Sequence, residues 1–242
     1  MPPTSQSTLP EGNQLLSRLS PEAKGRLFPL LKRVDLQLGD VIHEAGEAPD
    51  YVYFPTDAII SLLYVMSDGA SGEIAVVGFE GLAGIMVFMG GESTPSRAIV
   101  QSAGTAFRLP AGALRREFHD CSDMRMLMLR YTQALITQMA QPAVCNRHHT
   151  IEQQLCRWLL LSLDRLPTNE LSMTQELIAN MLGVRREGVT EAAGRLQKKG
   201  VIEYSRGHIT VLDRNKLEAL SCECYAAVRR ETERLQSCPS AL

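Results

Sequence analysis

The chain has 242 residues and a formal net charge of −2, with 45% hydrophobic and 21% charged residues, an ordinary globular balance. No run of about 18 apolar residues occurs, which excludes a membrane-spanning helix. The first 13 residues lack the basic and apolar regions of a secretory signal. We therefore expect a cytoplasmic protein with one large or two smaller domains and with reduced cysteines.

The first half of the chain is dominated by short β-prone runs. A helical pattern at residues 13–31 precedes these runs. Within it, a second helix is expected to begin at Pro21, with Ser20 as its N-cap. Between residues 34 and 109 many glycines separate the runs, of which the clearest are residues 52–54, 58–66, 73–77 and 97–100. A hairpin turn is expected at residues 67–72. This pattern predicts either an antiparallel barrel or a double-sheet, jelly-roll-like β-roll.

A long glycine-free segment follows at residues 123–146 and predicts a helix. Its recurring apolar residues, at spacings of four, three, four and four, are Met124, Met128, Tyr131, Leu135 and Met139. This spacing is typical of a coiled-coil seam, so we expect the helix to join two chains. A core helix inside one domain has the same periodicity and is the alternative. Pro142 is expected to end or kink the helix.

Residues 173–204, MTQELIANMLGVRREGVTEAAGRLQKKGVIEY, predict two helices joined by a tight turn and followed by a strand. The first helix, at about residues 174–182, begins at a cap supplied by Ser172 or Thr174, and Gly183 permits the positive φ of the turn. The second helix ends at Gly200. Residues 201–204 and 208–212 then predict a two-stranded wing with Arg206 at its tip. This order of elements predicts a DNA-binding module.

Charged residues at the start of the second helix are the candidates for DNA recognition. Arg can donate two hydrogen bonds to guanine and Glu can accept one from cytosine, so Arg186 and Glu187 suit G·C pairs. Between residues 183 and 216, eight Lys or Arg stand against four acids, an excess that suits phosphate contact. Solvated charges at an exposed helix start are the alternative. The predicted DNA-binding residues are Arg185, Arg186, Glu187, Thr190, Glu191, Arg195 and Arg206.

This arrangement resembles the Crp/Fnr family of bacterial transcription regulators. The resemblance is carried by TQELIANMLGVRREGVTEAAGRLQKKGVIEYSRGHITVLDR at residues 174–214, LGDVIHEAG at 38–46, and NRHHTIEQQLCRWLLL from residue 146. It implies an α+β fold: a cyclic-nucleotide-binding-like β-roll, a long dimerisation helix and a C-terminal winged helix-turn-helix. It also implies a homodimer on a two-fold symmetric site in double-stranded DNA, with RNA polymerase as a protein partner.

The expected domains follow from this resemblance. They are a sensor domain at residues 14–119, a dimerisation helix and hinge at 120–149, a winged helix-turn-helix at 150–214 and a helical tail at 215–242. Residues 150–153 predict a capping box at the start of the DNA-binding domain.

Two departures from the family pattern alter the expected ligands. The family's Arg-Glu pair is followed one turn later by Arg, whereas this chain has Glu191, so we expect a different DNA half-site. The family's nucleotide cassette, Gly-Glu-Leu followed by Arg-Ser or Arg-Thr with Ala, is rearranged here. We favour another nucleotide or no ligand over cyclic AMP. The candidate ligand-binding residues, with Arg97 the strongest, are Glu80, Gly81, Gly91, Glu92, Arg97 and Ala98.

The remaining residues predict neither an enzyme nor a metal site. Nucleophile motifs, a P-loop and paired catalytic acids are absent from the sequence. Cys222 and Cys224 suit a thiol or metal site only weakly, and we expect them to pack a C-terminal amphipathic helix with Leu217, Leu220 and Val228. Cys145, His148 and His149 lie close together at the hinge. Polar residues at a helix junction are the more common explanation of such a group, and ligation of haem or a metal ion is the less common one. The alternative function is a nucleotide-binding signalling protein whose C-terminal module mainly contacts protein.

Overall fold

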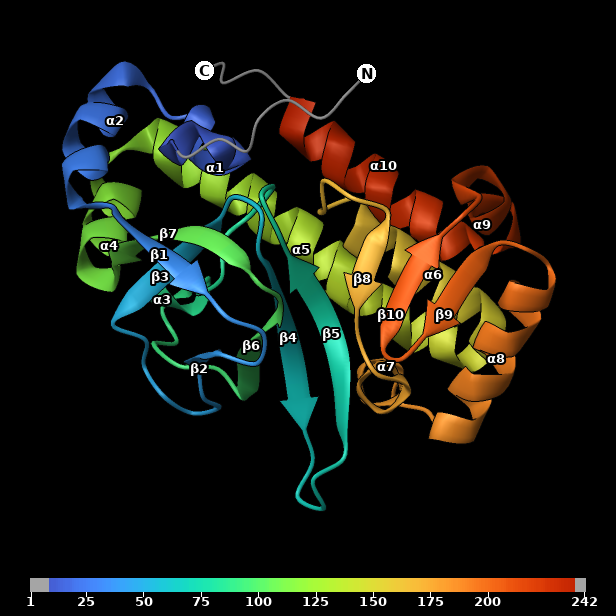
Figure 1. The fold of residues 1–242 in the computed structure, drawn as a ribbon. Coiled ribbons are helices and arrows are strands. Elements are labelled where there is room, and N and C mark those ends of the chain that lie inside the picture. Colours follow the sequence, from blue (N-terminus) through green and yellow to red (C-terminus); the bar gives the residue numbers. More distant parts are fainter. Residues whose placement is uncertain (1–8, 238–242) are drawn as a thin grey trace.

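The computed structural model describes residues 9–237, whose N-terminal part is an antiparallel β-roll of two sheets (Figure 1). One sheet has the order β1–β7–β3, built from β1 (Lys32–Leu36), β7 (Gly104–Pro110) and β3 (Tyr51–Pro55). The other has the order β2–β6–β4–β5, built from β2 (Val41–His43), β6 (Ser96–Ser102), β4 (Ile59–Val65) and β5 (Ser71–Val77). The pairings are antiparallel, which confirms the predicted β-roll.

Alternate residues of these strands fill the space between the sheets. Val52 and Phe54 of β3, Val100 of β6 and Leu109 of β7 are almost fully buried. This period of two is what a strand with one face on a core requires. The hairpin between β4 and β5 turns at Gly69, whose φ of 86° lies in the left-handed region. The turn therefore lies at the predicted position.

Short helices accompany the β-roll. They are η1 (Pro10–Gly12), α1 (Gln14–Ser17), α2 (Pro21–Leu27), η2 (Phe28–Leu30), α3 (Met86–Met89) and α4 (Ala111–Asp120). The side chain of Ser20 accepts a hydrogen bond from the N–H of Ala23, and Pro21 occupies the first turn of α2. The second helix therefore begins where its sequence signals place it.

The long helix α5 (Ser122–His148) crosses both halves of the molecule (Figure 1). Met124, Met128, Tyr131 and Leu135 belong to the core of the β-roll and are at most 7% exposed. The predicted dimer seam is therefore wrong for this face, and the core-helix alternative is correct. The periodicity shows that this face of the helix packs against apolar residues, but it does not show whether they belong to the same chain or to a second chain. Here they belong to the β-roll of the same chain.

The C-terminal part contains the predicted winged helix-turn-helix. Its elements are α6 (Ile151–Leu163), β8 (Glu170–Ser172), α7 (Gln175–Leu182), α8 (Arg186–Lys198), β9 (Ile202–Ser205) and β10 (His208–Val211). Thr150 and Gln153 form the expected capping box of α6. The sheet has the order β8–β10–β9, so the wing contains one strand more than the sequence predicts.

Two helices follow the wing, α9 (Arg214–Leu220) and α10 (Glu223–Ser237), instead of the single predicted amphipathic helix. Ser221 is extended, with φ −73° and ψ 164°, and separates the two helices. Leu217 is buried in the core of the winged helix-turn-helix domain, whereas α10 lies along α5 (Figure 1). The helix α5 also continues through Pro142 to His148, because its packing against α10 compensates for one missing hydrogen bond.

The winged helix-turn-helix domain packs directly on the β-roll. Ile59 of β4 and Val76 of β5 share a core with Leu159 of α6. At the same contact, the Trp158 indole donates a hydrogen bond of 3.0 Å to Glu73, and Arg165 pairs with Glu80 at 2.8 Å. Within residues 9–237, no helix is both long and apolar enough to cross a membrane.

Candidate DNA-binding surface and sensor pocket

The helix-turn-helix presents the start of α8 to solvent. Val189, Ala192 and Leu196 face the domain core and are fully buried. Gly183 turns the chain between α7 and α8 with a φ of 65°, and its N–H caps the end of α7. The turn therefore needs glycine, because other residues rarely adopt this conformation.

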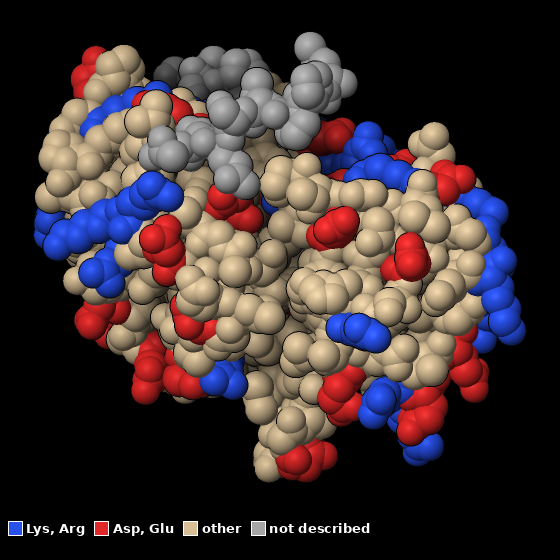
Figure 2. Space-filling model, in the orientation of Figure 1, with Lys and Arg blue, Asp and Glu red and all other residues tan. Residues whose placement is uncertain are grey.

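The exposed face of α8 carries most of the predicted base-reading residues. Arg186, Glu187, Thr190 and Glu191 are exposed, and Arg185 is the N-cap residue of the helix. The Thr190 hydroxyl donates to Gln175 at 2.7 Å, which ties the second helix to the first. Along this domain, Lys and Arg side chains gather at the edge formed by α8 and α9 (Figure 2). The start of α8 is therefore open to a ligand from outside.

A groove of about 450 Å³ lies between α7, the start of α8 and the wing. Arg186 lines one side, and Arg206 lines the other from the β9–β10 turn, where its φ is 49°. The hydroxyl of Tyr204 donates to the carbonyl of Met173 at 2.9 Å and fixes the wing against the start of α7. Sequence reasoning found both arginines but missed Tyr204 and Gln175, because the packing of the wing on α7 brings them there.

Arg195 has a different environment from the other predicted DNA-binding residues. Its Nε lies 2.7 Å from Glu152 of α6, and Lys199 pairs with the same carboxylate. Burial opposes the charge of Glu152, but the hydrogen bonds from Lys199 and Arg195 lower the pKa of this carboxyl overall. Arg195 therefore joins α8 to α6, and it also lies 3.8 Å from Glu191.

The predicted ligand-binding residues of the β-roll do not form one site. Glu80 faces the DNA-binding domain and pairs with Arg165, and Gly81 lies against Tyr131, whose ring would stand only 2.4 Å from an added Cβ. Arg97 pairs with Glu44 at 3.1 Å near the surface. Ala98 is buried in the core. The exposed Glu92 has a φ of 56°, and Gly91 lines a pocket.

That pocket has a volume of about 240 Å³ and lies between α3, the start of β6 and α5. Leu62, Leu82, Met86 and Leu135 give it an apolar lining, and the lining contains no Lys or Arg among the described residues. His43 also lines it, and burial lowers the pKa of this imidazole, which favours the neutral ring. The pocket therefore lacks the cation that a buried phosphate requires.

Two family models match the chain. A cyclic nucleotide-binding domain matches residues 33–121, and a Crp-like helix-turn-helix domain matches residues 153–220. Together these spans cover well over half of the chain. A search of curated proteins finds no match.

Solved structures show the same fold at low sequence identity. A protein from Eubacterium rectale assigned to the Crp/Fnr family is 19% identical, with a TM-score of 0.67, and 87% of this chain and 98% of that chain are covered. FixK2 from Bradyrhizobium japonicum is 16% identical, with a TM-score of 0.66 and coverage of 79% and 98%. The transcriptional regulator TTHA1359 of Thermus thermophilus is 20% identical, with a TM-score of 0.64 and coverage of 78% and 98%. This chain thus belongs to the Crp/Fnr family of transcription regulators, with a cyclic nucleotide-binding domain joined to a DNA-binding helix-turn-helix.

Proposed function

We propose that this regulator binds a two-fold symmetric DNA site as a homodimer, with Arg186 and Glu187 contacting base edges. The observation that carries the proposal is the exposed start of α8. Within the described chain, Arg185, Arg186 and Glu187 form no ion pair, so their side chains are available to DNA. A bidentate contact from Arg186 to guanine contributes about 1–3 kcal/mol of discrimination.

The groove beside α8 supports a second set of contacts, to the DNA backbone. Arg206 at the wing tip and Arg185 at the start of α8 are both exposed and suit phosphate oxygens. Glu191 is exposed but lies near Arg195, which partly neutralises it. An acid at this position cannot donate to guanine or phosphate, so the half-site differs from the family's familiar one.

A face of α5 opposite to the predicted seam suits the dimer contact. Its large exposed apolar residues are Met126, Leu129, Ile136 and Val144, which are 43%, 43%, 56% and 53% exposed. Met126, Leu129 and Ile136 follow the three-and-four spacing of a coiled-coil seam, with Gln133 between them. A dimer formed along this face needs its two α8 helices on successive major grooves, about 34–36 Å apart, to bind such a site.

The first experiment selects DNA fragments from a random pool with the purified protein. We expect a two-fold symmetric consensus containing G·C pairs. Arg186→Ala should lose about 10- to 100-fold of affinity for that consensus and retain weak, salt-sensitive binding. Arg116→Ala removes the same charge from α4 of the β-roll and should bind like wild type. A wild-type protein without sequence preference at any salt concentration would favour a protein-contacting role for the C-terminal module.

The second experiment tests the dimer face. Ile136→Glu places a charge in the proposed seam and should convert a dimer to a monomer in analytical ultracentrifugation. Leu38→Glu introduces the same charge at an exposed apolar residue of the β-roll and should leave the dimer intact. A dimeric Ile136→Glu protein would place the contact elsewhere.

The sensor proposal follows from the apolar pocket. We expect no tight binding of cyclic AMP, because the described lining contains no cation for the phosphate. Isothermal titration with cyclic mono- and dinucleotides tests this expectation. If a cyclic nucleotide binds tightly and Arg97→Ala weakens this binding, Arg97 would be a ligand-binding residue after all. The family also suggests action in the cytoplasm together with RNA polymerase.

A further inference from the structure

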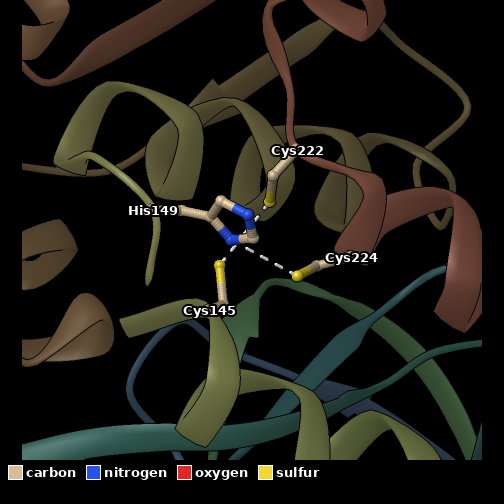
Figure 3. Close-up of side chains that lie close together, drawn as sticks. All are labelled: Cys145, His149, Cys222 and Cys224. Atoms are coloured by element: carbon tan, nitrogen blue, oxygen red, sulfur yellow. Dashed lines mark hydrogen bonds between the residues drawn. The ribbon is translucent and has the colours of Figure 1, made fainter. Parts of the chain in front are cut away.

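Four metal-ligating side chains meet where α5, the hinge and α10 join. Cys145 lies in the last turns of α5, and His149 is the residue that ends this helix. Cys222 and Cys224 flank the first residue of α10. One ligand atom from each residue lies within 4.8 Å of the other three. Figure 3 shows these side chains pointing toward one another.

The separations of these atoms suit one tetrahedral ion. The Sγ atoms of Cys145 and Cys222 are 3.6 Å apart, and the Cys224 Sγ lies 3.5 Å from His149 Nδ1. A tetrahedron with Zn–S bonds of about 2.3 Å places two sulfurs about 3.8 Å apart, and a sulfur and a nitrogen slightly closer. Both distances lie near these values. A disulfide requires about 2.05 Å, and the three cysteines of the cluster are free.

The groups around the cluster orient its histidine. The Glu223 carboxylate lies 3.3 Å from His149 Nε2, which leaves Nδ1 facing the three sulfurs. The side chain of Gln154 donates to the His149 carbonyl at 3.0 Å and holds the backbone of the hinge. A carboxylate on the distal nitrogen is the usual partner of a metal-binding histidine, because it fixes the tautomer and the ring.

Burial and charge also suit a closed metal site. Cys145, Cys222 and Cys224 are at most 5% exposed, and the His149 side chain is 13% exposed. Three thiolates and one divalent cation leave a single negative charge. The hydrogen bond with Cys222 and burial raise the pKa of the Cys145 thiol, and the positive charge of Arg157 of α6, itself only 7% exposed, opposes this rise. A buried cation beside a buried anionic centre reduces the cost of taking both from water.

We propose that Cys145, His149, Cys222 and Cys224 bind one Zn²⁺ ion in a closed site with three thiolates and one imidazole. Four protein ligands complete the tetrahedron, so the ion has a structural role. It joins the end of α5 to the start of α10, beside the hinge that leads into the DNA-binding domain. The pattern is hard to find in the sequence because Cys145 and Cys222 are 77 residues apart.

The first test measures metal in the full-length protein purified under reducing conditions without a chelator. We expect one zinc per chain by inductively coupled plasma mass spectrometry. Cys145→Ser and His149→Ala should lose it. Cys121→Ser and His148→Ala are matched controls outside the cluster and should retain it. Zinc that both cluster variants retain in full would overturn the proposal.

The second test uses the wild-type protein, so a variant that fails to fold does not decide the outcome. After removal of zinc, one equivalent of Co²⁺ should give thiolate-to-cobalt charge-transfer bands and the visible bands of a tetrahedral site. The absence of these bands overturns the proposal. So does iron accompanied by acid-labile sulfide, or a Cys145–Cys222 disulfide in freshly purified protein.

Glu223→Gln tests the positioning role of the carboxylate beside His149. We expect about 10- to 100-fold weaker zinc binding with the charge-transfer bands retained, because the four ligands remain. Unchanged affinity would remove Glu223 from the site. Loss of the bands would show that the carboxylate does more than orient the imidazole and would overturn the positioning role.

Discussion

Charged residues on α8 and at the contact between the two domains have opposite environments. Arg186 and Glu187 are exposed, and neither forms an ion pair within the described chain. At the domain contact, Arg165 and Glu80 form a pair in which both side chains are at most 12% exposed. The first arrangement is open to DNA, whereas the second holds the β-roll against the DNA-binding domain.

This difference shows that pairing decides which charged side chains are available to a ligand from outside. The whole chain has a net charge of only −2, so overall attraction to DNA is weak. Arg195 lies on the same helix as Arg186, yet Glu152 engages it in an internal contact. The proposed DNA contacts therefore rest on the arginines of this surface that form no ion pair among the described residues.

The largest effect is expected from breaking the buried pair. Arg165→Ala leaves the Glu80 carboxylate in the domain contact without its main cation, which costs about 3–5 kcal/mol of stability. Arg165 also contacts Gln138 of α5 at 3.4 Å, so the loss affects both domains. Urea unfolding monitored by circular dichroism measures the change.

The matched control is Arg97→Ala, which removes the partner of Glu44. These side chains are 36% and 47% exposed, so water compensates the remaining charge. We expect a change of less than about 1 kcal/mol. Equal losses in the two variants would contradict the contrast between the buried and the exposed pair.

Local signals in the sequence predicted much of this fold. Ser20 and Thr150 cap the helices that they precede, and Gly183 has the positive φ that the turn requires. Arg186 and Arg206 also lie on one groove. In these cases the deciding interactions lie within a few residues or within one small motif.

Long-range packing set the features that sequence patterns missed. The apolar stripe that includes Met128 contacts the β-roll. The sequence could not predict this contact, because the period of a helix does not specify its packing partner. Glu80 and Arg97 carry suitable chemistry for a ligand, yet the fold directs them to Arg165 and Glu44. The cluster around Cys145 needs the course of α10 along α5, which no local pattern contains.

A smaller effect is expected at the wing. Arg206→Ala removes one proposed phosphate contact, so binding should weaken similarly on every DNA sequence. The slope of log affinity against log salt concentration should fall by about one. Fluorescence anisotropy at several salt concentrations, on the selected site and on random DNA, provides both values. A loss confined to the selected site would assign Arg206 to base readout.

A further effect is expected from pH at the domain contact. Glu73 is partly buried beneath α6, and burial raises its pKa from 4.5 to about 7, although hydrogen bonds from Ser61 and Trp158 oppose this shift. The folded protein therefore binds more protons than the unfolded chain between these two pH values. Stability contributed by this group should be present at low pH and decrease as pH rises through this window.

Trp158 provides a direct measurement, because it is the only tryptophan in the chain and its indole donates to Glu73. We expect its fluorescence to change with a midpoint near pH 7. Glu73→Gln keeps a hydrogen-bond acceptor but cannot ionise, so this transition should disappear. Glu203→Gln, on the exposed face of the wing, should retain it. A transition that persists in Glu73→Gln would assign the titration to another group, and the domain contact would then hold its charged residues without this pH dependence.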